Sequence, residues 1–67
     1  MRISKKMIRN KVQYLAYKKC EYKITVFERA GLNSILTIYK DNTLILDRSL
    51  SNKDIMAYLE KIEGSCY

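Results

Sequence analysis

The sequence predicts an α+β domain of the order α-β-β-β-α, in which a three-stranded antiparallel sheet packs against two helices. Apolar residues recur at helical spacing near both ends of the chain, whereas the middle alternates with a period of two and is rich in β-branched and aromatic residues. With 67 residues, two glycines and no proline, we expect a single domain over residues 1–67, built of long elements and short turns.

The first element is predicted to be a helix over residues 4–19. Ser4 is a suitable N-cap, because its side-chain oxygen can accept a hydrogen bond from a free backbone N–H of the first turn. Ile8, Val12 and Leu15 follow at intervals of four and three residues, which places them on one stripe of the helix. This stripe is expected to face the core.

Three strands are predicted next, over residues 22–29, 34–40 and 43–48. Between the first two lies a turn in which Gly31 and Asn33 are able to take a positive φ. Asp41 and Asn42 separate the second strand from the third and are typical of a two-residue hairpin turn.

Both faces of this sheet are apolar. The expected buried face carries Ile24, Val26, Leu36, Ile38, Leu44 and Leu46. The opposite face carries Phe27, Ile35, Tyr39 and Ile45. Either each helix covers one face, or both helices cover the same face and the other is a binding surface.

The last element is predicted to be a helix over residues 51–63. Ser51 as N-cap and Asp54 three residues later form an approximate capping box, and Gly64 suits the position just after the helix. The side chains expected to face the core are Ile55, Leu59 and Ile62.

The order of elements resembles that of the double-stranded-RNA-binding domain, which is also α-β-β-β-α. That family carries a Lys-Lys-x-Ala-Lys run at the start of its last helix, where this chain has Ser51-Asn52-Lys53-Asp54. The Gly-Pro loop between that family's first two strands is missing here as well. The resemblance therefore extends to the order of elements, and the family's function is not carried over.

The positive charge is concentrated in the first third of the chain. The net charge is +6, yet residues 1–23 hold eight basic side chains and one acidic one, while residues 24–67 hold five basic and six acidic ones. This asymmetry predicts an anionic partner for the first helix, and nucleic-acid phosphates are the leading choice.

The candidate binding residues are Arg2, Lys5, Lys6, Arg9, Lys11, Gln13 and Lys18. Gln13 suits an adenine edge if the helix enters a major groove. The alternative is a solvated face that merely keeps the protein soluble.

A second candidate surface is aromatic and comprises Tyr14, Phe27 and Tyr39. With Lys23 and Arg29 nearby, Phe27 and Tyr39 resemble a stacking platform for unpaired bases. The expectation, however, is that they pack beneath a helix, because a small domain needs every large side chain in its core. Exposed aromatics would instead favour a protein or a single-stranded partner.

Catalysis is not expected. The chain has no histidine to serve as a base, no Gly-rich phosphate loop and no metal-ligand spacing, so we expect neither a cofactor nor a metal site. Cys20 and Cys66 are predicted to be reduced thiols of a cytoplasmic protein. No apolar segment is long enough for a membrane span, which excludes a membrane partner of that kind.

The sequence therefore predicts a small basic nucleic-acid-binding regulatory protein without enzymatic activity. Its many Lys, Ile, Asn and Tyr residues are typical of AT-rich coding sequence and suggest a phage or other mobile element. The alternative is a stoichiometric inhibitor or adaptor that binds a nucleic-acid-handling host enzyme or an anti-phage defence complex. A monomer and a homodimer both remain open.

Overall fold

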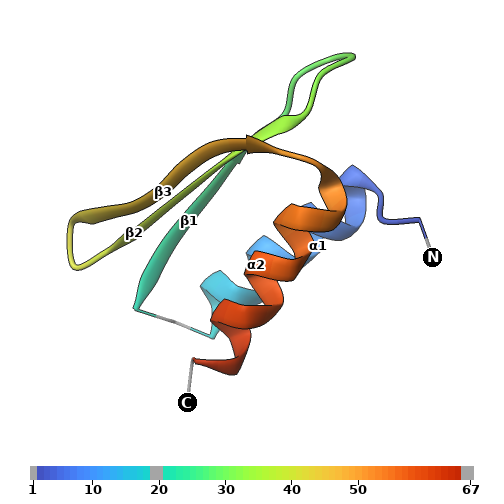
Figure 1. Ribbon diagram of the computed structural model, residues 1–67. Helices are drawn as coiled ribbons and strands as arrows, with labels where there is room; N and C mark the ends of the chain where they lie inside the picture. Colours follow the sequence, from blue (N-terminus) through green and yellow to red (C-terminus); the bar gives the residue numbers. More distant parts are fainter. Residues whose placement is uncertain (1, 19–20, 66–67) are drawn as a thin grey trace.

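The computed structural model describes residues 2–18 and 21–65 and has the predicted α+β architecture. Its elements are α1 (Lys5–Tyr17), β1 (Tyr22–Phe27), β2 (Ser34–Lys40), β3 (Thr43–Leu50) and α2 (Asn52–Gly64). The strands form one antiparallel sheet in the order β1-β2-β3, and both helices lie on the same side of it (Figure 1). Cys20 and Cys66, predicted to be reduced thiols, lie outside the described residues.

Both helices begin at the predicted N-caps. The backbone N–H of Met7 donates to Ser4 Oγ at 3.2 Å, and that of Asp54 donates to Ser51 Oγ at 3.3 Å. Gly64 does not occupy the position just after the helix that was predicted for it. It is the last residue of α2, and the following Ser65 caps the helix, with its backbone N–H donating to the Ile62 carbonyl at 2.9 Å.

The strand boundaries differ from the prediction at two places. β1 ends at Phe27 because the chain then turns, and the Arg29 guanidinium donates to the Asn33 carbonyl at 2.7 and 2.9 Å across that turn. Gly31 takes the expected positive φ of 69°, whereas Asn33 does not. β3 continues two residues beyond the prediction, to Leu50, since it remains paired with the start of β2.

The hairpin between β2 and β3 is confirmed. Asp41 and Asn42 have φ values of 53° and 65°, the double left-handed conformation of a type I′ turn. This turn matches the right-handed twist of the flanking strands, and it prefers glycine at its second position.

Replacing Asn42 with Gly is therefore expected to stabilise the domain by about 0.5 kcal/mol, because glycine adopts a positive φ without steric cost. The matched control is Asn33→Gly, where φ is not positive and the added chain entropy should lower stability by about 0.5 kcal/mol. Thermal unfolding of both variants checks the prediction. A loss of stability in Asn42→Gly would contradict the type I′ assignment.

One prediction about the sheet faces is wrong. The pairing of β2 with β3 is irregular at Ile38/Tyr39, where Ile38 lies opposite Leu46 and Tyr39 opposite Leu44. Ile45 is therefore the extra residue of a bulge, and the alternation of side chains is reset there. Leu44, expected in the core, lies with Tyr39 on the outer face and is half exposed, while Ile45 lines the helix side.

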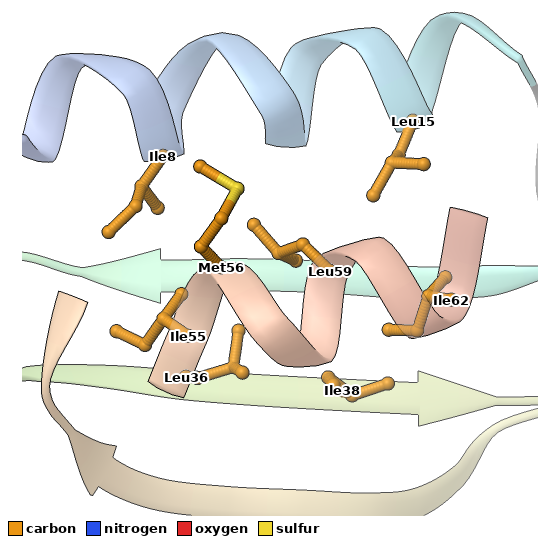
Figure 2. Packing of buried hydrophobic residues seen from close by; sticks show 8 residues of the cluster. All are labelled: Ile8, Leu15, Leu36, Ile38, Ile55, Met56, Leu59 and Ile62. Atoms are coloured by element: carbon orange, nitrogen blue, oxygen red, sulfur yellow. The ribbon is translucent and has the colours of Figure 1, made fainter. Parts of the chain in front are cut away.

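The hydrophobic core lies between the two helices and the inner face of the sheet (Figure 2). Its fully or nearly buried members are Ile8, Leu15, Leu36, Ile38, Ile55, Met56, Leu59 and Ile62. Val12, Ile24, Val26 and Leu46 are partly buried and pack around this cluster. The seam of the first helix and the core face of the last helix are thus confirmed. Because both helices cover this one face, the opposite face of the sheet has no helix over it.

Candidate nucleic-acid interface on the first helix

The basic residues predicted to bind phosphate lie on the part of α1 that points away from the core. Lys6, Arg9 and Gln13 are exposed, and Arg2 is exposed just before the helix begins. Ile8 and Leu15 are buried on the opposite side of the same helix. Arg9 Nε lies 3.4 Å from Glu28 Oε2 in a solvent-exposed ion pair, which costs little to open. These four side chains are accessible to a ligand.

Two other predicted residues have structural partners within the domain. The Lys5 ammonium donates to the Arg29 carbonyl at 3.0 Å, which holds α1 to the turn after β1. The Lys11 ammonium lies 2.6 Å from Glu63 Oε1, and both side chains are about three-quarters buried. Because these contacts already engage the two ammonium groups within the domain, Lys5 and Lys11 are secondary contributors to any external contact.

Tyr14 forms a separate flank of α1 together with two lysines. Its ring centroid lies 5.7 Å from Lys11 Nζ and 5.2 Å from Lys18 Nζ, within the range of cation–π attraction. The ring is about half exposed. Tyr14 and the two lysines thus form an aromatic-basic flank on this side of α1.

The charges of α1 are unfavourable for the helix itself. The helix has no acidic residue, and Lys5 and Lys6 occupy its first turn. Cations there oppose the positive end of the helix dipole, at a cost of about 0.3–1 kcal/mol each where the charge is exposed. The second helix has the favourable arrangement, with Asp54 in the first turn and Lys61 in the last. The charges of Lys5 and Lys6 therefore do not serve helix stability.

The sequence interpretation missed two exposed residues on α1. Asn10 and Tyr17 follow Lys6 at intervals of four and eleven residues, so they lie on the same outward stripe. Tyr17 is 86% exposed. Their helical spacing from Lys6 already predicts that they face outward. They were not selected because the candidate phosphate-binding residues were chosen mainly for positive charge, and neither residue is charged.

The expectation that Phe27 and Tyr39 pack beneath a helix is wrong. Both lie on the outer face of the sheet, with exposures of 61% and 39%. Tyr39 pairs with Lys23, four residues before Phe27 in β1, so the two rings are separated by about 13 Å along the strands. Asp47, which accepts a hydrogen bond from Thr37, lies in the row between them. The two rings do not form one continuous stacking platform.

A hollow of about 310 Å³ lies on the helix side of the sheet, between α2 and the end of the β2-β3 hairpin. Ile45 and Tyr58, both partly exposed, line it together with Ile62 and Lys61. It is open to solvent and mostly apolar. Neither an acidic side chain nor a residue of α1 is among those that line it.

Comparisons with protein-family models, curated proteins and solved structures find no match to this chain. Within residues 2–18 and 21–65, no helix is long and apolar enough to cross a membrane. The same residues contain no group of three His, Cys, Asp or Glu side chains placed to hold a metal ion. Function is therefore inferred from the surfaces described above.

Proposed function

We propose that this protein binds nucleic acid through the outward face of α1 and acts as a small, non-enzymatic regulatory protein of a phage or mobile element. Arg2, Lys6 and Arg9 contact phosphates, and Lys18 adds to the positive potential of the same helix. The observation that carries this proposal is a basic stripe of three exposed residues, Arg2, Lys6 and Arg9, on a helix that has no acidic residue. Lys6 also opposes the dipole of this helix.

A solvated helix that only provides solubility does not explain this pattern. In α2 the first-turn acid Asp54 compensates the neighbouring Lys53, which gives solubility at little cost, whereas α1 has no acid in its first turn. On α1, the two first-turn lysines together cost about 1 kcal/mol, and Lys5 and Arg9 add a like-charge pair four residues apart. Phosphates bound by Lys6 and Arg9 neutralise part of this charge, so binding offsets part of a cost that the free domain carries.

The test uses one charge reversal in α1 and its counterpart in α2. Lys6 is the second residue after the N-cap Ser4, and Lys53 is the second residue after the N-cap Ser51. Each is exposed. Lys6→Glu is expected to raise the free energy of unfolding by about 0.5–1 kcal/mol and to weaken nucleic-acid binding by at least about tenfold at 0.1 M salt.

Lys53→Glu makes the same chemical change at the same helical position and is expected to leave the affinity within about threefold of wild type. Gel shifts with duplex DNA, single-stranded DNA and RNA over a salt series measure the affinity, and thermal unfolding measures the stability. A wild-type protein that binds no nucleic acid at low salt contradicts the proposal. Equal losses in both variants would place the interface elsewhere than on α1.

The outer face of the sheet favours a second candidate, a stoichiometric inhibitor or adaptor that binds a host protein. Its exposed or half-buried apolar side chains are Phe27, Ile35, Tyr39 and Leu44. Lys23 and Asp47 are the strand charges of this face and cancel, and the Arg29 guanidinium lies at its end, where it donates to Ser49 Oγ. The face is thus less basic than the outward side of α1, which suits a protein surface better than phosphates. A host protein that co-purifies at equal stoichiometry with both wild type and Lys6→Glu would favour this candidate.

A further inference from the structure

The side chains farthest from the core on α1 form one stripe that consists of Lys6, Asn10, Gln13 and Tyr17. At 100° per residue, these four positions fall within about 60° of one another and lie opposite the buried Ile8 and Leu15. All four are exposed. The two amides occupy the middle of the stripe, with a cation before them and a phenol after them.

Cations lie on both flanks of this stripe. Arg9 is on the β1 side, where it pairs with Glu28. On the α2 side lies Lys18, beside the Tyr14 ring. In cross-section, the helix therefore presents a cation, an amide and a cation. The major groove of B-form DNA has the complementary order, with phosphates on two walls about 12 Å apart and base edges on the floor. A helix of about 10–12 Å diameter fits between these walls.

The amides have no evident role within the domain. Asn is a poor helix former, yet Asn10 stands in the middle of α1, and among the described residues no hydrogen bond from its side chain is found. Phosphate binding alone requires cations and does not require Asn10 or Gln13. Asn and Gln side chains, in contrast, make bidentate hydrogen bonds to the N6 and N7 atoms of adenine in the major groove.

We infer that α1 enters the major groove of duplex DNA and that Asn10 and Gln13 read adenine edges there. This inference rests on the proposed function and names its ligand as B-form DNA that contains A·T pairs. A-form RNA is excluded as the preferred ligand because its major groove is too deep and narrow for a helix. Single-stranded nucleic acid has phosphates that the cations can contact. It has no groove, however, that holds base edges in fixed positions for the two amides.

The experiment begins with selection of the preferred site from a library of randomised duplexes. Affinity for that site is then compared with affinity for the same duplex after its A·T pairs are changed to G·C. Wild type is expected to discriminate by roughly 5- to 150-fold for each base pair read. The double variant Asn10→Ala/Gln13→Ala is expected to bind both duplexes equally, with the salt dependence of wild type. Asn33→Ala, which removes an exposed amide outside α1, is the control and should keep the discrimination.

The outcomes separate this inference from the proposed function. Equal binding of all duplexes by wild type overturns the inference and leaves phosphate binding by α1 in place. Discrimination that survives in Asn10→Ala/Gln13→Ala also overturns it, because other residues then read the bases. Tighter binding to duplex RNA than to DNA overturns the B-form assignment. Failure to bind any nucleic acid at low salt overturns both proposals.

Discussion

Replacing Arg2, Lys6 and Arg9 together with alanine is expected to weaken nucleic-acid binding by roughly 500-fold at 0.1 M salt. Each phosphate that a side chain neutralises contributes about 0.9 to the slope of log affinity against log salt. Three contacts therefore contribute about 2.7 decades of affinity at this salt concentration, and the slope should become shallower by about 2.7. Binding isotherms of wild type and variant over a salt series measure both quantities.

The triple variant is expected to remain folded. None of the three side chains belongs to the core, and the Arg9–Glu28 ion pair is exposed and contributes at most about 1 kcal/mol. Alanine is also the best helix former, and the loss of Lys6 removes a cation from the first turn. The melting temperature should therefore be unchanged or higher. A variant that stays folded and binds as tightly as wild type would contradict the assignment of this surface.

Replacing Leu59 with alanine is expected to destabilise the domain by about 3 kcal/mol. Leu59 is fully buried in α2, where it packs between the first helix and the sheet (Figure 2). Removal of its side chain leaves a cavity, and such changes cost about 2–5 kcal/mol. In a domain of this size, 3 kcal/mol lowers the melting temperature by roughly 12–24 °C. Thermal unfolding followed by circular dichroism measures the change.

Leu32→Ala is the matched control for this substitution. Leu32 lies in the turn between β1 and β2 and is 61% exposed, so its truncation should cost less than about 0.5 kcal/mol. Similar melting temperatures for Leu59→Ala and wild type would show that α2 does not pack against the core as described. The same variants also separate a loss of binding caused by unfolding from one caused by the loss of a contact.

Local physical chemistry made the elements predictable from the sequence. The caps Ser4 and Ser51 act on backbone groups within three residues, and the Asp41-Asn42 turn depends on the conformations of those two residues alone. The exposure of Lys6 and Arg9 could also be predicted from the sequence, because helical periodicity places them away from the buried seam. The basic stripe of the candidate interface is thus a property of the sequence read as a helix.

The tertiary structure alone decided which surfaces are available. Both faces of the sheet were apolar in sequence, so only the packing of both helices on one face leaves Phe27 and Tyr39 exposed. The bulge places Leu44 on the outer face and Ile45 on the helix side, the reverse of the prediction. It arises from the pairing between β2 and β3 and cannot be read from the sequence of either strand alone. The same holds for the lysines of α1. Lys5 and Lys11 resemble the other cations in sequence, but their partners lie 24 and 52 residues away, and only the folded chain brings those partners into contact.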